Sequence, residues 1–398
     1  MSAARSLALP FPVRLVPQPA LDPVLVALTS TLLLGGLVVL ASASIAVADG
    51  GQTGSFAFVW RQLLAIGVGL GGAVFMLCVP TTFWQRSGFL LVLLALALLA
   101  VVLIPGVGHA VNGSTRWLRI GSITIQVSEP ARLAVILYLA GYIVRRGQDL
   151  STRFVGFLKP MVVITLAAVL LLAEPDFGAA TVLVATALAM LFIGGARIRD
   201  FLAFFGVAVA ALATLAVSSP YRMRRLTACL NPWEDPWDSG FQLTQSLIAI
   251  GRGEWFGVGL GASVQKMFYL PEAHTDFVFA VFAEEFGLLG ALVLIGLFLA
   301  LVWRILGLAR KLSEAGHWFQ AYAVFGFGIW LGLQAFINIG VNMGLLPTKG
   351  LPLPLVSYGR SSLIVTLAGI GFVLRACHEL TAAPVSTGRG RRRKRAAT

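Results

Sequence analysis

The sequence predicts an all-α membrane protein, a polytopic bundle of about ten transmembrane helices, and composition is the first reason. Of the 398 residues, 58% are hydrophobic and only 12% are charged. A water-soluble domain usually has about a quarter of its residues charged, because they cover its surface. The second reason is that apolar runs long enough to span a bilayer recur along the chain. These two observations exclude the soluble fold classes.

The apolar runs are separated by polar, glycine or proline residues, which predicts one helix for each run. The runs fall at 23–48, 57–79, 88–106, 130–145, 160–173, 177–195, 198–218, 276–303, 318–341 and 354–377. Several are close to the twenty or so residues that cross the hydrocarbon of a bilayer. The runs at 130–145 and 160–173 are shorter, which suggests tilted helices or neighbouring re-entrant backbone. The transmembrane domain is therefore expected to occupy residues 23–378.

Both ends of the chain are expected to lie in the cytoplasm. Residues 1–22 contain four prolines and are predicted to form a disordered arm, and residues 379–398 form a basic tail that includes Arg391–Arg395. With the N-terminus inside, the arm, the short loops and the tail place 19 of the 30 Lys and Arg residues on the cytoplasmic side. This excess follows the positive-inside rule. The basic residues are not interleaved with aromatic ones, so the net charge of +13 does not indicate nucleic-acid binding.

Two loops on the opposite side are too long to be simple connections. One covers residues 107–129, and the other is a large extracytoplasmic loop over residues 219–275. Within the large loop, Leu243, Leu247 and Ile248 fall near one face of a helix. This pattern predicts an amphipathic helix that lies in the outer membrane interface.

Ionisable residues at membrane depth are the first candidates for function, because placing them in lipid is costly. The set is Arg61, Glu129, Arg132, Glu174, Asp176, Asp276, Glu284 and Glu285. Asp276 ends the stretch LPEAHTD, where an outer loop becomes a helix. It could cap that helix as a structural carboxylate or act as a base, and His274 is an equal candidate base on sequence grounds. For Glu284 and Glu285 a buried ion pair is the simpler interpretation.

Other catalytic motifs are absent from the sequence or lack the structural context that they require. The glycines of 257–261 follow no strand of a βαβ unit, and the sequence contains no Walker motif, G-x-S-x-G elbow or H-E-x-x-H motif. The acidic residues of 234–238 could mimic a metal site, but the prolines among them predict a turn-rich loop. Three widely spaced cysteines support neither a disulfide framework nor a zinc site.

Several stretches resemble the SEDS family of bacterial envelope polymerases. They are 270–285 (LPEAHTDFVFAVFAEE), 231–236 (NPWEDP), 242–246 (QLTQS), 346–350 (LPTKG), 352–357 with Ser361-Ser362, and 145–147 (RRG). They are spread over most of residues 60–375. The stretch 259–266 (GLGASVQK) and the QLTQS form are more similar to the division members of the family than to the elongation members.

The resemblance implies a peptidoglycan glycosyltransferase that joins lipid II disaccharides at the outer face of the cytoplasmic membrane during septal cell-wall synthesis. It implies a class B penicillin-binding transpeptidase (FtsI-like) and other division proteins as partners, and a location at the division septum. The family's essential acidic residue falls on Asp276. The positions that the family associates with its substrate cavity are Arg61, Glu129, Arg132, Lys349 and Ser357.

The implied reaction is the attack of a sugar 4-hydroxyl on an anomeric carbon that carries a lipid diphosphate. A single inverting displacement needs a base for the hydroxyl, for which Asp276 is the candidate. Arginine and lysine side chains would stabilise the leaving diphosphate, alone or with a divalent cation. No other cofactor and no metal ligand is assigned. Two other functions stay open: a lipid II flippase, and a non-catalytic scaffold that recruits a transpeptidase.

The sequence departs from the family pattern in two places. The family usually has a proline directly after the glutamine of the segment that corresponds to Gln126–Arg132, whereas here Pro130 follows Glu129 and the usual lysine is Arg132. The displaced proline could shift the start of that helix. In the second place, Arg360 replaces the second glycine of S-Y-G-G-S-S, and its guanidinium could bind an anion or a headgroup.

Overall fold

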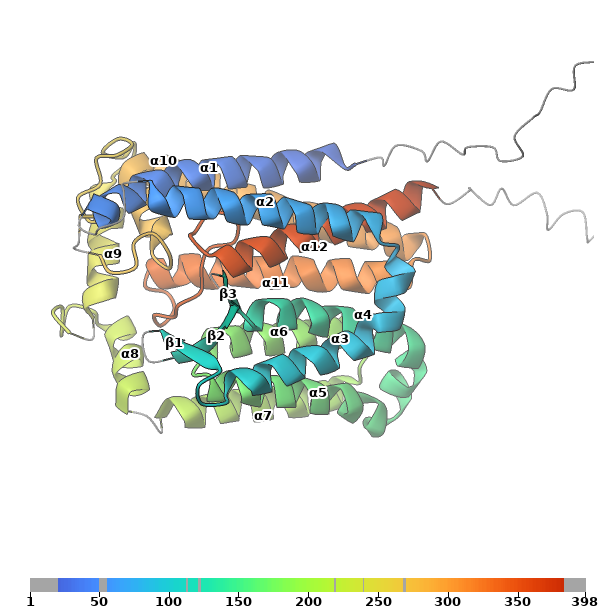
Figure 1. The fold of residues 1–398 in the computed structure, drawn as a ribbon. Helices are drawn as coiled ribbons and strands as arrows, with labels where there is room; N and C mark the ends of the chain where they lie inside the picture. The colour runs from blue at the N-terminus through green and yellow to red at the C-terminus, as the bar shows by residue number, and fades with distance from the viewer. Residues whose placement is uncertain are drawn as a thin grey trace, which may run out of the picture.

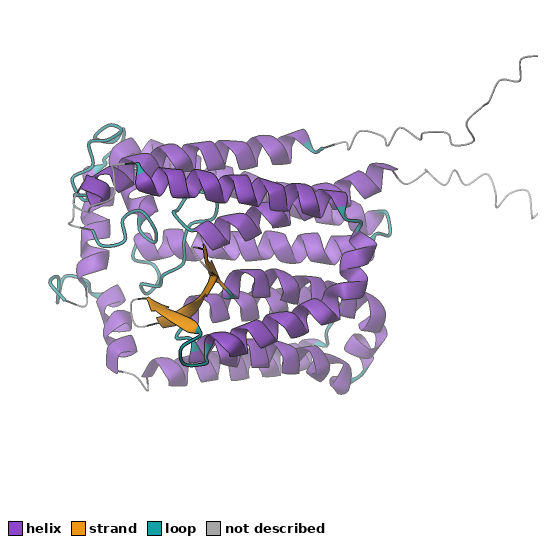
Figure 2. Cartoon of the chain, viewed as in Figure 1, coloured by secondary structure: helices purple, strands orange, loops and turns teal. Residues whose placement is uncertain are grey.

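The computed structural model describes residues 21–49, 56–111, 114–120, 123–217, 220–238, 240–267 and 270–382 (Figure 1). All of the expected N-terminal arm except its last two residues, and all of the tail beyond residue 382, lie outside the described residues. The described chain forms a bundle of roughly parallel and antiparallel helices, with one small sheet and two shorter helices at one end of it (Figures 1 and 2).

Ten long helices build the bundle in the described part of the chain, one for each predicted apolar run. They are α1 (Pro23–Asp49), α2 (Ala57–Cys78), α3 (Thr81–Val102), α4 (Ser128–Thr152), α5 (Phe154–Ala173), α6 (Phe177–Ile193), α7 (Ile198–Val217), α10 (Val278–Glu314), α11 (Trp318–Asn342) and α12 (Arg360–Ala382). Seven of these described helices, α1–α3, α5 and α10–α12, are long and apolar enough to cross a membrane. Helices α4 and α6 pack among them, and α7 packs on α6. The predicted all-α, multi-pass membrane fold is confirmed.

One predicted detail of the bundle is wrong. The run at 160–173 belongs to a longer helix, because α5 begins at Phe154 and has 20 residues. The run at 130–145 is close to the observed helix: Glu129 conceals the first turn of α4, and the helix is broken at Arg146, where φ is −131° and ψ is 24°. Helix α4 starts at Ser128, so Pro130 falls in the first turn, where a proline costs no intrahelical hydrogen bond.

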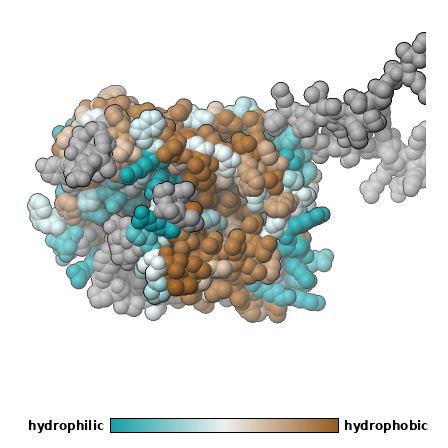
Figure 3. Space-filling view, in the orientation of Figure 1, coloured by the Kyte–Doolittle hydropathy of each residue, from teal (hydrophilic) through white to brown (hydrophobic). Residues whose placement is uncertain are grey.

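One end of the bundle, the basic end, holds the start of α1 and the end of α12 (Figure 1). Contacts fix both helices there: Arg304 pairs with Asp22, and Glu379 accepts hydrogen bonds from Thr81. A band of hydrophobic residues covers the side of the bundle next to this end, and the end itself is hydrophilic (Figure 3). The two ends of the described chain therefore lie on the same side of the apolar band, as an even number of crossings requires.

The opposite end, the loop end, carries the elements that are neither simple turns nor spanning helices. Three short strands, β1 (Gly108–Val111), β2 (Ser114–Ile120) and β3 (Ile123–Gln126), form an antiparallel sheet in the order β1-β2-β3 (Figure 2). The sequence analysis did not predict this sheet. Helices α8 (Pro220–Leu230) and α9 (Phe241–Arg252) lie in the predicted large loop.

Helix α9 confirms the predicted helix in the large loop but presents a different face to the protein. Its buried residues are Leu243, Thr244, Ser246 and Ala249, and the Ser246 hydroxyl donates to the Asn342 carbonyl at 2.8 Å. Ile248, which the prediction placed on the same face as Leu243, is 37% exposed. The helix packs on α10 and α11, so its orientation is set by protein contacts.

Candidate functional site

Asp276 lies at the loop end, on the irregular segment 270–277 that leads into α10. Its backbone carbonyl accepts hydrogen bonds from the side-chain amides of Asn338 at 2.9 Å and Asn342 at 3.0 Å, both on α11. Its side chain is partly exposed. The spanning helix α11 thus holds the backbone of Asp276.

The capping interpretation of Asp276 is wrong in position. The N-cap of α10 is Phe277, which makes no side-chain capping bond, and Asp276 lies one residue outside it. In the first turn of α10, the amide N–H of Ala280 donates to the Asn342 side-chain oxygen at 3.1 Å. An amide from α11 therefore binds an N–H group that a capping side chain would otherwise take.

The Asp276 carboxylate rests against the loop that joins α11 to α12. A β-carbon built on Gly350 would lie 2.9 Å from Oδ2 of Asp276, so only a glycine leaves this space free. Lys349, the neighbouring residue, is half-buried, and burial lowers the pKa of its ammonium below the usual value. No carboxylate forms an ion pair with Lys349 within the described residues. The predicted binding lysine is thus the chain neighbour of the glycine that the Asp276 carboxylate approaches.

Two further predicted residues are Ser357, which lies in the same loop, and Arg61, which lies on α2. Ser357 is 3% exposed, and its hydroxyl accepts the Leu353 N–H at 2.8 Å. The Ser357 carbonyl accepts the Gln62 side-chain amide at 3.2 Å. Ser357 therefore holds the turn 353–357 onto α2. Arg61 precedes Gln62 on α2 and is exposed, so its guanidinium is available to a ligand at the bundle surface.

His274, the alternative base, is packed among aromatic rings. Its ring lies 4.8 Å from that of Phe58 and 5.8 Å from that of Tyr358, centroid to centroid. Its Nδ1 is buried without a hydrogen-bond partner in the described structure, and burial lowers the pKa of the imidazole. The Tyr358 N–H donates to the His274 carbonyl at 3.0 Å. These contacts make His274 a neutral packing residue that joins segment 270–277 to the α11–α12 loop.

Glu129 and Arg132 form a buried ion pair inside the bundle. Arg132 Nη2 lies 3.0 Å from Glu129 Oε1, and the two side chains are 2% and 0% exposed. Arg132 Nη1 donates to the side-chain oxygen of Gln334 at 2.8 Å, and the guanidinium lies 5.7 Å from the ring centre of Trp330. Both predicted residues are therefore brought together, but they face protein groups.

A polar stripe on α11 connects this pair to Asp276, and the sequence analysis missed it. The stripe consists of Gln334, Asn338 and Asn342, all at most 1% exposed. Gln334 donates to the Pro352 carbonyl at 3.0 Å, and Asn338 donates to the Leu351 carbonyl at 2.7 Å. The signal was present in the sequence: three amides spaced by four residues in the mostly apolar second half of α11 mark one polar face.

Glu284 and Glu285 confirm the ion-pair interpretation. Lys266 Nζ lies 2.8 Å from Glu285 Oε1. Glu284 accepts the Ser263 hydroxyl at 2.5 Å and lies 3.8 Å from Arg252 Nη1. The two carboxylates thereby fix the loop 253–266 onto α10, and this loop leads directly to the segment that carries Asp276.

The Arg360 guanidinium binds a side chain of the small sheet. Its Nη2 donates to the Thr124 hydroxyl at 2.7 Å, and the Ser361 hydroxyl accepts the Gln126 N–H at 3.0 Å. The start of α12 is thus tied to β3. The arginine that replaces the glycine of the family pattern attaches the small sheet to the bundle.

Glu174 and Asp176 lie between α5 and α6 and hold the other side of the sheet. The Asp176 carboxylate caps α6 by accepting the Ala179 N–H at 3.0 Å, and it lies 3.7 Å from Arg116 of β2. The Glu174 side chain is fully buried, and burial, with the neighbouring Asp176 charge, raises its pKa to about 8. These two acids support the sheet and stand apart from the Asp276 contacts described above.

The chain matches known proteins over most of its length. The sequence profile of the FtsW, RodA and SpoVE family, described as cell cycle proteins, matches residues 23–382. A probable peptidoglycan glycosyltransferase FtsW from Thioalkalivibrio sulfidiphilus is 54% identical over 355 residues, which cover 89% of each chain.

Two solved structures share the fold. One, from work on the structural coordination of polymerization and crosslinking by a peptidoglycan synthase complex, is 31% identical with a TM-score of 0.75 and covers 91% of this chain and 99% of its own. The other, the rod shape determining protein RodA of Thermus thermophilus, is 30% identical with a TM-score of 0.68 and covers 90% of this chain and 97% of its own. The chain therefore belongs to the FtsW, RodA and SpoVE family of cell cycle proteins.

Proposed function

We propose that this chain is a peptidoglycan glycosyltransferase that polymerises lipid II into glycan strands at the outer face of the cytoplasmic membrane. The observation that carries the proposal is the setting of Asp276, a partly exposed carboxylate where a loop enters a spanning helix, with its backbone fixed by two buried amides. The name of the 54% identical relative supports the same activity. A lipid-linked substrate also needs an enzyme that lies in the membrane.

In the proposed reaction Asp276 is the base of a single displacement. Its carboxylate accepts the proton of the acceptor 4-hydroxyl while that oxygen attacks the anomeric carbon of the donor. The bond between the anomeric carbon and the diphosphate oxygen breaks with inversion, and the lipid diphosphate leaves with the electron pair. One glycosidic bond forms for each diphosphate released.

Positive charge for the leaving diphosphate would come from Lys349 and Arg61. Lys349 adjoins the glycine against which the Asp276 carboxylate rests, and Arg61 is exposed one residue before the amide that binds the same loop. Glu129, Arg132 and Ser357 would act on the substrate less directly, because their polar atoms bind protein groups. In the described residues no three His, Cys, Asp or Glu side chains converge. A divalent cation would accordingly be held mainly by the diphosphate itself.

The distribution of charge along α4 favours a polymerase over a flippase. Helix α4 carries Glu129 and Arg132 near the loop end and Arg145 near the basic end, and the twelve residues of 133–144 include no charge. At 1.5 Å per residue this uncharged stretch covers about 18 Å. A flippase would need polar groups along that distance to carry a headgroup across. The presence of a carboxylate at position 276 likewise favours an enzyme over a non-catalytic scaffold.

The proposed setting is the division septum, with the basic end of the bundle in the cytoplasm. The excess of Lys and Arg on the short turns supports this orientation. It places Asp276 at the outer face, where a class B transpeptidase would crosslink the new strands. A solved relative from a peptidoglycan synthase complex supports such a partner.

Purified full-length chain mixed with lipid II, alone and with a class B transpeptidase, tests the function. We expect glycan strands, seen as a ladder of polymer on a gel, in at least one of the two mixtures. Absence of polymer from both, with the protein folded and lipid II bound, would contradict the proposal. Transfer of lipid II between the leaflets of a vesicle without any polymer would establish the flippase instead.

A further inference from the structure

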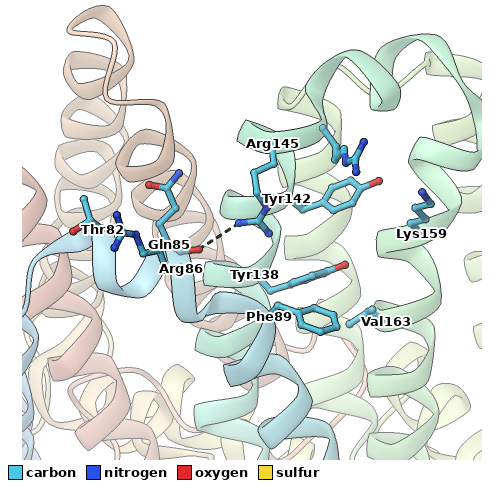
Figure 4. A pocket seen from close by; sticks show the side chains of 10 residues that line it. Thr82, Gln85, Arg86, Phe89, Tyr138, Tyr142, Arg145, Lys159 and Val163 are labelled. Carbon is cyan, nitrogen blue, oxygen red and sulfur yellow. Dashed lines mark hydrogen bonds between the residues drawn. The ribbon is translucent and has the colours of Figure 1, made fainter.

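A cavity of about 890 Å³ opens between α3, α4 and α5 at the basic end of the bundle (Figure 4). We call it the basic groove. Its lining residues are Thr82, Gln85, Arg86, Phe89, Tyr138, Tyr142, Arg145, Arg146, Lys159 and Val163. Nothing in the proposed reaction uses this groove, since Asp276 lies at the opposite end.

The groove carries four positive charges and no carboxylate among its lining residues. Arg146 forms an exposed ion pair with Asp149 at 3.2 Å. Arg145 Nη1 donates to the Gln85 carbonyl at 3.3 Å, which positions the guanidinium without neutralising it. Arg86 and Lys159 have no acidic partner within the described residues. The groove is therefore built to attract an anion.

A second observation is an unpaired donor in the wall of the groove. Tyr138 and Tyr142 are 5% and 7% exposed, and their rings lie 6.1 Å apart. The Tyr142 hydroxyl donates to the Gly156 carbonyl at 2.6 Å. The Tyr138 side chain is also buried, and its hydroxyl forms no hydrogen bond with a described residue. A ligand oxygen in the groove would supply that partner.

The groove is polar at one end and apolar at the other. In Figure 4 the Arg145, Gln85 and Lys159 side chains lie toward the end of the bundle, and Phe89 and Val163 lie further along the helices. The adjacent helix surfaces are apolar and exposed: Phe89 is 55% and Val162 is 59% exposed. A ligand that fills the whole groove must therefore carry an anionic group at one end and a hydrocarbon chain at the other.

We propose that the basic groove binds an anionic phospholipid, with the headgroup phosphate among the four cations and an acyl chain along Phe89 and Val163. Basic pockets between transmembrane helices are suited to such headgroups. The chain's own termini do not fit, because residues 1–20 and 383–398 contain no acidic residue and would be repelled. An acidic peptide would satisfy the charges but not the apolar end.

Native mass spectrometry of the purified full chain in detergent tests the proposal with dioleoylphosphatidylglycerol, dioleoylphosphatidylcholine and inorganic phosphate as probes. We expect phosphatidylglycerol to bind at least about tenfold more tightly than phosphatidylcholine, since the headgroup charge is the difference between them. The variant R86Q/R145Q/K159Q should lose at least that factor. The matched control R199Q/R310Q/K311Q removes the same charge from exposed residues outside the groove and should bind as the parent does.

Tyr138→Phe removes only the unpaired hydroxyl and should weaken phosphatidylglycerol binding by a few-fold, which keeps the test valid if the triple variant fails to fold. Equal binding of the two lipids by the parent would overturn the proposal. So would unchanged binding by both groove variants. Inorganic phosphate that binds as tightly as phosphatidylglycerol, or an acidic peptide that displaces the lipid, would assign the groove to a different ligand and overturn the lipid assignment.

Discussion

Two carboxylates that the sequence singled out, Asp276 and Glu129, lie in opposite surroundings although one helix supports both. Asp276 is partly exposed on an irregular segment, and Asn338 and Asn342 of α11 hold its backbone. Glu129 is fully buried in the first turn of α4 and pairs with Arg132, which Gln334 of α11 also binds. The polar stripe of α11 thus holds the main chain at Asp276 and the side chain of Arg132, the partner of Glu129.

The difference separates the proposed catalytic group from one that holds the bundle together. Glu129 is committed to a neighbouring cation, and a change of its charge leaves Arg132 buried without a partner. Asp276, the proposed base, is partly exposed, and its carboxylate lies against Gly350. Substitution at Asp276 should therefore reduce activity, and substitution at Glu129 should reduce stability.

The largest expected effect is that of Asp276→Asn on catalysis. Asparagine keeps the shape and hydrogen-bonding reach of the side chain but cannot accept the proton, so polymerisation of lipid II should fall by about 10²–10⁴-fold. Binding of lipid II and thermal stability should stay near the parent values. His274→Gln is the control, and its loss should be smaller because that ring serves packing. Near-normal glycan synthesis by the asparagine variant would return Asp276 to a structural role.

Glu129→Gln should lower the free energy of unfolding by about 3–5 kcal/mol, because it leaves the buried Arg132 charge uncompensated. Thermal or denaturant unfolding of the purified protein in detergent measures the loss. The double variant Glu129→Gln, Arg132→Met removes both charges and should recover part of it. A single variant as stable as the parent would show that the pair does not stabilise the bundle.

Gly350→Ala should reduce activity by about 10–100-fold, because the added β-carbon would lie 2.9 Å from the Asp276 carboxylate and displace it. The fold should persist, since a loop side chain can shift to relieve the contact. Gly359→Ala in the same loop meets its nearest neighbour at an ordinary 3.4 Å and serves as the control. Equal rates for the two variants would mean that the position of the carboxylate does not limit the reaction.

A further expected effect is the pH dependence that Glu174 gives to stability. Its pKa is raised from 4.5 to about 8 in the folded protein, so the folded state binds more protons than the unfolded state between these values. The resulting stabilisation is complete below about pH 4.5 and is lost, at about 1.4 kcal/mol per pH unit at most, as the pH rises to about 8. Glu174→Gln should flatten the curve of melting temperature against pH, and the exposed Glu234→Gln should not. Parallel curves for the parent and Glu174→Gln would contradict this account.

The sequence predicted the bundle well because hydrophobic runs report helices in lipid directly. The prediction was less accurate where a charge lies inside a helix: Glu129 concealed the start of α4, since its pairing with Arg132 holds the carboxylate in the buried first turn. The sheet β1–β3 was missed because its short strands lie in a loop and are fixed by distant residues such as Arg360.

The candidate site was predicted only in part. The Asp276 side chain lies against Gly350 in the α11–α12 loop, a proximity that no sequence spacing contains. Ser357 falls at a predicted binding position, yet its hydroxyl is used by the Leu353 N–H. Motifs thus located the segments, and tertiary contacts decided which side chains in them are available to a substrate.

Chemical rescue tests the central claim, that a carboxylate at position 276 accepts a proton, most directly. Asp276→Ala removes the carboxylate and leaves a space in which added formate can replace it. We expect polymerisation of lipid II by this variant to be nearly absent, and to rise with formate toward a plateau that chloride at equal ionic strength does not produce. An alanine variant that polymerises lipid II at the parent rate without formate would contradict the claim.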